Sequence, residues 1–222
     1  MIRDAIFEGK IKPEERLTIE RIAADLGVSR TPVREALKAL EADGIVSILP
    51  NRGAVVRRFD TDELRDRYSV RAHLEGYAGE LACGRDSNGS LAKALEDNCE
   101  QLNNLLGRSR SGRLEDVSAL VELNMRFHEL ILTASGSTLV TRILGGLQMP
   151  IAYRLYHWRD HERRQSALDF HRRIAAAFRA KKPAKVRQLL ESHILETRDY
   201  LLASQGPGRS IARMNAEHRR KS

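Results

Sequence analysis

The chain contains the stretch Ser29-Arg30-Thr31-Pro32-Val33-Arg34-Glu35-Ala36-Leu37, which decides how its N-terminal region folds. The apolar residues of this stretch, continued by Leu40, recur at helical spacing and predict one inward-facing stripe. Arg30 and Arg34 lie one turn apart, so they share a face opposite that stripe. Two guanidinium groups on the first half of a helix suit bidentate contact with guanine O6 and N7 in the major groove of DNA.

A shorter helix is predicted before this stretch. Its helical spacing is set by four apolar residues, Ile19, Ile22, Ala23 and Leu26. Gly27 then supplies the tight turn between the two helices. Ser29 and Thr31 are both candidate N-caps of the second helix, and Pro32 is tolerated in its first turn.

A β-hairpin is predicted after the second helix, which ends at Gly44. Residues 45–49 predict one strand and residues 54–56 predict the returning strand. The residues between them, Pro50-Asn51-Arg52-Gly53, are typical of a turn. Helix, turn, helix and hairpin in this order predict a winged helix-turn-helix domain over residues 1–59.

A winged helix would place several further residues against DNA. Ser29 and Thr31 at the start of the second helix suit phosphate. Arg52 and Gly53 at the tip of the wing suit the minor groove, since glycine lets the backbone approach closely. The alternative is a solvated basic face on an ordinary helix. The preceding helix, the turn and the wing together favour DNA binding over that alternative.

Net charge alone does not indicate nucleic-acid binding. The chain carries a net charge of +8, but residues 1–59 hold 11 Lys/Arg against 9 Asp/Glu, and residues 206–222 hold 5 against 1. Half of the excess therefore lies in a polar, basic C-terminal tail, which is predicted to be disordered. DNA binding must depend on the local placement of a few arginines.

The composition excludes several classes of protein. No run of about 18 apolar residues could span a membrane, and the N-terminus lacks the apolar stretch of a signal peptide. Cys83 and Cys99 are too few for a disulfide framework, so we expect buried, reduced thiols in a cytoplasmic protein. A hydrophobic content of 41% allows a real core, and only 5% aromatic residues favours helical packing.

An all-α bundle is predicted from residue 60 to residue 205, so the predicted fold class is mainly α. Its six helices are predicted at roughly 60–83, 88–107, 113–134, 137–158, 161–181 and 183–204. Segments that contain Gly, Ser or Pro separate most of them, and the region near His157–His161 separates the fourth from the fifth. The last helix carries an apolar stripe made of Val186, Leu189, Leu190 and Ile194.

Three histidines lie in separate predicted helices of this bundle. His128 shares a helix face with Asn124, which lies four residues earlier, while His171 and His193 belong to the fifth and sixth helices. Three imidazoles and one oxygen that converge suit a divalent ion such as Zn, Ni or Mn. The alternative is that these histidines only cap helices or pack in the core.

The N-terminal region resembles the GntR family of bacterial transcription regulators, through Leu26–Leu37, Leu40, Gly44 and Arg52-Gly53. The resemblance implies a homodimer on a short palindromic operator in double-stranded DNA. It implies that Arg30 and Arg34 read bases, with support from Ser29, Thr31 and Gly53. One departure is Glu20, which occupies a position where relatives often have a further DNA-contacting arginine.

The bundle resembles the FCD domain, the helical effector domain of the FadR branch of that family. The resemblance is carried by Asn124-Met125-Arg126-Phe127-His128, Asp169-Phe170-His171 and Ser192-His193-Ile194. It implies a divalent metal ion held by Asn124, His128, His171 and His193. Asn124 departs from the family, in which Asp is usual, and an amide oxygen binds a divalent cation less strongly than a carboxylate does.

Arg71 resembles an arginine of the first FCD helix that faces the cavity and pairs with a ligand carboxylate. Beside a bound metal, a bidentate arginine makes a clamp for a small organic acid. The alternative is an intrahelical pair of Arg71 with Glu75. Tyr153 and Arg154, in the fourth predicted helix, are further candidates for the effector pocket.

The sequence as a whole predicts a DNA-binding transcription regulator, interpreted as a repressor, whose operator binding responds to a small organic acid in a metal-containing helical domain. It does not predict an enzyme, because neither a nucleophile elbow nor a metalloprotease motif is present. Three alternatives stay open: a sensor for which the metal is the signal, a metal-dependent hydrolase, and a DNA-binding protein whose bundle only dimerises.

Overall fold

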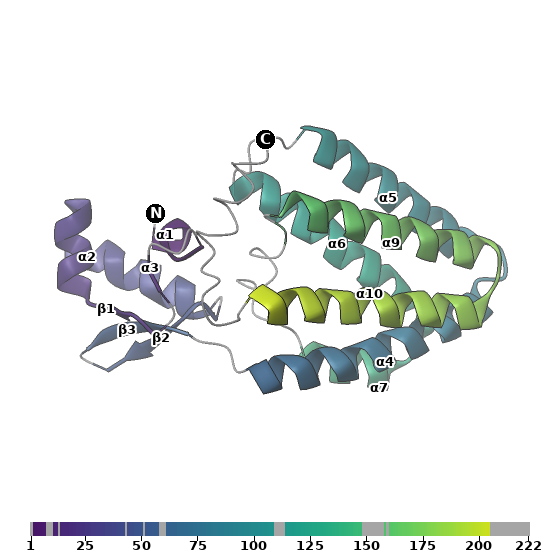
Figure 1. The fold of residues 1–222 in the computed structure, drawn as a ribbon, viewed down its shortest axis with the longest axis horizontal. Coiled ribbons are helices and arrows are strands. Elements are labelled where there is room, and N and C mark those ends of the chain that lie inside the picture. The colour runs from purple at the N-terminus through teal and green to yellow at the C-terminus, as the bar shows by residue number, and fades with distance from the viewer. Residues whose placement is uncertain are drawn as a thin grey trace. The chain divides into compact units, whose positions relative to one another are not determined.

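The computed structural model describes residues 2–7, 11–12, 14–42, 44–50, 52–57, 61–108, 114–147, 158 and 160–204. The predicted disordered tail over residues 206–222 lies outside these ranges, as do Tyr153 and Arg154. The described residues fall into two compact units: residues up to Thr61 together with 202–204, and residues 62–147, 158 and 160–201. Figure 1 draws both units.

The first unit is a winged helix, as predicted. Its helices are α1 (Ile2–Phe7), α2 (Ile19–Leu26) and α3 (Arg30–Ala42), and its strands are β1 (Arg16–Leu17), β2 (Val46–Leu49) and β3 (Gly53–Val56). The strands form an antiparallel sheet in the order β1-β3-β2. Strand β1 was not predicted, because two residues are too few to show the alternation of a strand.

The core of the first unit confirms the predicted stripe of α3. Val33, Leu37 and Leu40 are buried there, together with Ile22 and Ala23 of α2. Gly27 has a φ of 64° and ends α2 in the left-handed conformation that favours glycine. The N-cap position of α3 falls to Ser29, because α3 begins at Arg30 and already contains Thr31.

Gly53 is required where β1 meets β3. Its φ is 84°, and a Cβ there would lie 2.1 Å from the backbone oxygen of Leu17. No side chain can occupy that space, so the fold itself needs a glycine at this position. Gly53 was predicted to let the backbone approach DNA closely. In the structure it lets the backbone of β3 approach Leu17 of β1.

The second unit consists of helices. They are α4 (Thr61–Arg85), α5 (Ser90–Arg108), α6 (Leu114–Ser135), α7 (Thr138–Gly146), α9 (His161–Arg179) and α10 (Pro183–Ser204). The predicted fourth helix over 137–158 was wrong in its length, since α7 ends at Gly146. Two adjacent glycines, Gly145 and Gly146, weaken the helix there, and Leu147 has left helical geometry with a ψ of 6°.

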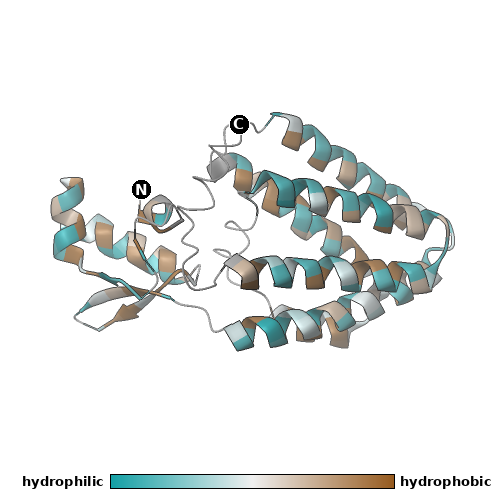
Figure 2. Cartoon of the chain, viewed as in Figure 1, coloured by the Kyte–Doolittle hydropathy of each residue, from teal (hydrophilic) through white to brown (hydrophobic). Residues whose placement is uncertain are grey.

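The core of the second unit is made by amphipathic helices, and Figure 2 shows hydrophobic and hydrophilic residues alternating around α9 and α10. The predicted stripe of α10 is buried over all four of its residues. Cys83 and Cys99 are buried free thiols, as expected. Burial raises the pKa of Cys99 to about 11, so this thiol is protonated and unreactive at neutral pH.

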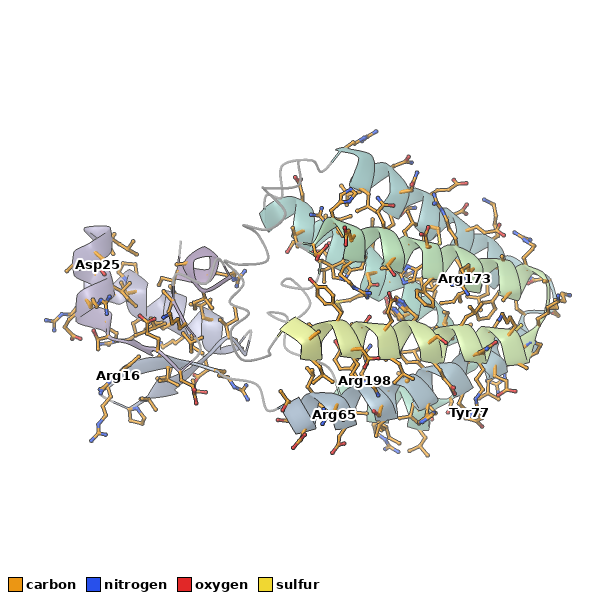
Figure 3. The ribbon with its side chains drawn as sticks, viewed as in Figure 1. Arg16, Asp25, Arg65, Tyr77, Arg173 and Arg198 are labelled. Atoms are coloured by element: carbon orange, nitrogen blue, oxygen red, sulfur yellow. The ribbon has the colours of Figure 1, made fainter. Side chains whose placement is uncertain are left out.

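Two glycines let α4 approach α10 closely. A Cβ on Gly79 would lie 2.2 Å from Cδ1 of Leu190, and one on Gly76 would lie 2.7 Å from Cγ of Glu191. Larger residues would therefore push the two helices apart. Arg198 of α10 also reaches α4, where its Nη1 donates to Ser69 Oγ at 3.1 Å (Figure 3). This packing fixes the position of Glu75, the residue directly before Gly76 on α4.

Among the described residues, no helix combines the length and the apolar character needed to cross a membrane.

Candidate metal centre and nucleic-acid interface

The residues predicted to read DNA lie at the start of α3. Arg30 is its first residue and Arg34 follows one turn later, and both are exposed while Val33 and Leu37 point into the core. Ser29 and Thr31 are exposed beside them. The structure therefore presents this group on one solvent-facing side of the first turns of α3.

Glu20 of α2 faces Arg30. Its Oε1 lies 3.7 Å from Nη1 of Arg30, and both side chains are more than half exposed. An exposed ion pair of this kind contributes only about 0.2–1 kcal/mol. Glu20 therefore holds Arg30 only weakly. The family resemblance leads one to expect an arginine at the position of Glu20.

The tip of the wing contains a residue that the sequence analysis missed. Arg52 donates its backbone N–H to Leu49 O at 3.0 Å and closes the turn. Arg16 of β1 donates from Nε to the backbone oxygen of Arg52 at 3.1 Å. Arg16 is exposed at the edge of the sheet (Figure 3). A second guanidinium thus accompanies Arg52, brought there by the unpredicted strand β1.

Three histidines converge in the interior of the helical unit. His128 of α6, His171 of α9 and His193 of α10 each offer a ring nitrogen, and these atoms all lie within 4.8 Å of one another. The rings of His128 and His193 are nearly parallel, with centroids 5.3 Å apart. The ring of His171 is turned by 72° to that of His193. Helices separated in sequence therefore build one cluster of imidazoles.

The burial of His171 provides a test of whether this cluster suits a metal. His171 is fully buried, and neither of its ring nitrogens has a hydrogen-bond partner among the residues that the structure describes. Burial, helped by the neighbouring rings of His193 and His128, lowers the pKa of His171 well below its ordinary value. Its imidazole is therefore neutral, which is the form that binds metal.

The spacing of the cluster also fits a metal ion. A metal about 2.0–2.1 Å from each nitrogen needs those nitrogens roughly 3.0–3.4 Å apart. Small movements of the rings would close the observed spacing to that range. Phe127 stacks on His171, with the ring centroids 3.8 Å apart and the planes at 2°. The donor set and its packing therefore suit a divalent ion held by histidine.

Asn124 lies one turn before His128 on α6 and is half-buried. Its position on the helix face of His128 is the one that the sequence analysis assumed. Its role as an oxygen ligand stays a prediction.

The alternative weighed for Arg71 is the arrangement that the structure contains. Arg71 donates from Nε and Nη2 to Glu75 Oε1, at 3.1 and 2.7 Å. The other oxygen of Glu75, Oε2, lies 2.7 Å from Nδ1 of His128. Arg71 is thus connected to the histidine cluster through a buried carboxylate. Sequence spacing predicts Glu75 only as a partner of Arg71, because the approach of α6 to α4 has no signal in local spacing.

The carboxylate of Glu75 is charged despite its burial. Burial alone would raise its pKa, but the Arg71 guanidinium and the His128 ring outweigh burial and hold the pKa far below the ordinary range. Arg71 is affected in the opposite sense, because burial opposes its charge while Glu75 and Tyr68 raise its pKa. The pair therefore carries both charges inside the helical unit.

Comparison with protein families gives two matches. The model of bacterial regulatory proteins of the gntR family matches residues 1–56. The model of the FCD domain matches residues 66–196. The two matches fall on the two units described above.

Several curated proteins are similar to the chain over most of its length. The HTH-type transcriptional regulator YdhC of Bacillus subtilis is 28% identical, covering 86% of this chain and 84% of its own. The Nta operon transcriptional regulator of Aminobacter aminovorans is 29% identical, covering 86% of each chain. The gluconate operon transcriptional repressor of Bacillus subtilis is 30% identical, over 66% of this chain and 57% of its own.

Solved structures show the same fold. Lar, described as controlling expression of the agr system in Listeria monocytogenes, has a TM-score of 0.60 and 20% identity, covering 92% of this chain and 94% of its own. McbR/YncC of E. coli has a TM-score of 0.59 and 24% identity, with the same coverage.

We predict that Arg34→Ala removes specific DNA binding and leaves the fold intact. A lost bidentate base contact costs about 1–3 kcal/mol, and a two-fold operator loses it twice, so affinity should fall roughly 30-fold or more. Electrophoretic mobility shifts on the operator and circular dichroism measure the two effects. Arg126→Ala is the control, because it removes the same charge at an exposed pair with Glu129 on α6. Full operator affinity in Arg34→Ala would show that this segment does not read DNA.

We predict that a divalent metal stabilises the protein and that His171→Ala removes the effect. A ligand at 100 times its Kd adds about 2.7 kcal/mol, which raises the Tm of a chain of this size by roughly 5–10 °C. Thermal unfolding with and without Zn, Ni or Mn measures this shift for each variant against its own metal-free protein. His73→Ala is the control, because His73 is an exposed histidine on α4. An equal shift in His171→Ala would exclude the cluster as the binding site.

Proposed function

This chain belongs to the GntR family of bacterial regulatory proteins and carries an FCD domain, and we propose that it is a repressor modulated by a small organic acid bound beside a divalent metal. The family and the curated relatives are transcription regulators that bind DNA, not enzymes. The hydrolase alternative is therefore set aside. The cluster of His128, His171 and His193 is the observation that carries the effector part of the proposal.

The metal would be held by the three histidines, with Asn124 as the proposed oxygen ligand. When bound, the ion supplies positive charge that attracts a ligand carboxylate. Arg71 supplies a second positive group nearby. Its Nε and Nη2 are directed at Glu75, and a guanidinium carries five N–H donors. The remaining donors give an acid ligand a place beside the existing pair.

An organic acid is the effector class that this chemistry favours. A neutral ligand would gain nothing from the two positive groups, whereas a carboxylate pairs with both. One relative is named for a gluconate operon, and gluconate is a small hydroxy acid. Tyr153 and Arg154 stay candidate pocket residues outside the described ranges.

A dimer is needed for the proposed recognition of DNA, because two winged helices read two half-sites of a palindrome. We propose that two copies of the chain meet through α4 and α7. These helices pack together through Ala78, Val140 and Leu144. Their outer side carries an exposed apolar set, Val70, Tyr77, Leu139 and Ile143 (Tyr77 is labelled in Figure 3).

This set, called the α4–α7 face below, suits a second copy of the chain. It holds four of the six large hydrophobic residues that are exposed in the described chain. Asp66 and Arg142 are exposed on the same two helices and have opposite charges. A two-fold interface brings the same surface of each copy together. A charged residue on the α4–α7 face therefore finds an opposite charge on the other copy only if the face carries both signs.

Induction follows from linkage between the two ligands. If the acid releases the repressor, it must bind the DNA-free form more tightly than the DNA-bound form, and DNA must weaken acid binding by the same factor. We propose that acid binding shifts the helices and takes the two winged helices out of operator register. The protein would work in the cytoplasm, where its operator is.

A metal sensor is the second candidate, favoured by Asn124. A neutral amide in place of a carboxylate suits weaker, reversible metal binding. In that case removal of the metal by itself would change operator affinity, with no acid required.

We predict that an organic acid weakens operator binding by the metal-loaded protein about 5–150-fold, the usual range of coupling. Arg71→Lys should retain operator affinity and lose this response, because lysine keeps the charge beside Glu75 but not the planar fork. Fluorescence anisotropy on operator DNA across an acid panel measures both. Arg67→Lys is the control, since Arg67 pairs with Glu63 one turn earlier on α4.

Two results would count against the acid model. Equal operator affinity across the whole acid panel would remove the effector. A change in operator affinity on chelation alone would instead identify the metal sensor.

We predict that Leu139→Glu with Ile143→Glu converts the protein to monomers and weakens operator binding. Burying two new carboxylates without partners is costly, so the interface cannot form. Light scattering measures the mass in solution. Met125→Glu on α6 is the control, because Met125 is an exposed apolar residue outside the α4–α7 face. A double variant that stays dimeric would place the interface elsewhere.

A further inference from the structure

A buried carboxylate lies between the proposed acid site and the proposed metal site. The side chain of Glu75 is 5% exposed, and its two oxygens have different partners. Oε1 accepts both hydrogen bonds from Arg71, while Oε2 lies against Nδ1 of His128. The carboxylate therefore touches one member of each site.

We propose that Glu75 is the carboxylate of the metal centre: it orients His128 as a ligand and supplies the negative charge that Asn124 does not. Glu75 is thus a positioning residue that acts through His128. This inference rests on the proposed metal site and adds a residue from α4 to it.

The contact at Nδ1 decides which atom of His128 can bind a metal. A carboxylate oxygen 2.7 Å from Nδ1 favours a proton on that nitrogen, because a carboxylate only accepts hydrogen bonds and a bare lone pair there would be repelled. The proton on Nδ1 leaves the lone pair on Nε2, so Nε2 is the nitrogen available to the cluster. Carboxylates that hold histidine ligands in this way fix both the tautomer and the ring orientation.

The charge of the site also favours a nearby carboxylate. Three neutral imidazoles and an amide leave both positive charges of a divalent ion uncompensated in a buried place, which is costly. Besides Glu75, the buried acidic residue in the described chain is Asp86. Asp86 accepts from the backbone N–H groups of Leu91 and Ala92 at the start of α5. Glu75 is therefore the buried carboxylate that contacts a histidine of the cluster.

Arg71 determines how strongly the negative charge of Glu75 acts on the metal. Its guanidinium donates two hydrogen bonds to Oε1 of Glu75, and its positive charge offsets part of the negative charge beside His128. An acid ligand that pairs with Arg71 would reduce this offset and strengthen metal binding. The same network therefore couples the two sites, and metal must strengthen acid binding by the same factor.

The test is the metal affinity of Glu75→Gln in the full-length protein. Competition with a chromogenic chelator should show Zn and Mn bound about 10–100-fold more weakly than by the wild type. Adding Asn124→Asp to Glu75→Gln should restore part of the loss, because it returns a carboxylate to the site. Glu80→Gln should bind as the wild type does, because Glu80 lies on α4 and pairs with Arg187 away from the cluster.

A purely structural role for Glu75 predicts a different pattern. If Glu75 only pairs with Arg71, then Arg71→Met and Glu75→Gln should change metal affinity alike. Under the proposal, Arg71→Met keeps or raises affinity while Glu75→Gln lowers it. The double variant Arg71→Met/Glu75→Gln leaves no unpaired buried charge, so it keeps the test open if the single variant misfolds. Wild-type affinity in the double variant would overturn the proposal.

The tautomer of His128 gives a readout that needs no metal. Nitrogen NMR of the metal-free protein should show the Nδ1–H form in the wild type and a mixture of tautomers in Glu75→Gln. An unchanged tautomer would overturn the positioning role. If the wild type binds no metal at all, the metal part of the proposed function fails while the tautomer result still decides the role of Glu75.

Discussion

The helical unit depends on buried polar groups whose partners must come from inside the protein or from a bound ligand. Three imidazoles and the Arg71–Glu75 pair lie inside the bundle, where an unpaired polar group is costly. Helices α4, α6, α9 and α10 each contribute to this group, so their positions are fixed by one shared set of contacts. Apolar packing alone would tolerate small shifts between helices. Polar groups with specific partners do not tolerate such shifts. An interior of this kind is suited to two discrete arrangements of the helices.

Close packing of α4 on α10 makes this arrangement possible. Gly76 and Gly79 let α10 approach, and Glu75 precedes them on α4. The position of the carboxylate is therefore a consequence of where α4 has small residues. A ligand that moves α4 by a fraction of an ångström would change the contact of Glu75 with His128. Because packed interiors have few stable arrangements, such a change would alter the whole unit.

Sequence patterns predicted the elements that repeat with a period, and missed those set by contacts between distant residues. The stripes of α3 and α10 were predicted because each is one buried helix face. The histidine cluster was suggested by spacing and by family resemblance, and the structure brings the three rings together. Strand β1 and the role of Glu75 were missed, since a two-residue strand has no period and the partner of Glu75 lies on another helix. The end of α7 at Gly146 shows that two glycines outweighed a continuing apolar pattern.

Burial determines how easily a ligand could replace the acidic partner of Arg30 or of Arg71. Glu20 and Arg30 form an exposed pair worth about 0.2–1 kcal/mol, so a DNA phosphate or base can replace Glu20 at little cost. Glu75 and Arg71 form a buried pair, and breaking such a pair by removing one partner costs about 3–5 kcal/mol. An acid effector therefore cannot displace Glu75 from Arg71 and must bind in addition to it. Under the proposed function, DNA recognition would exchange partners at Arg30, whereas effector recognition would extend a network that is already formed at Arg71.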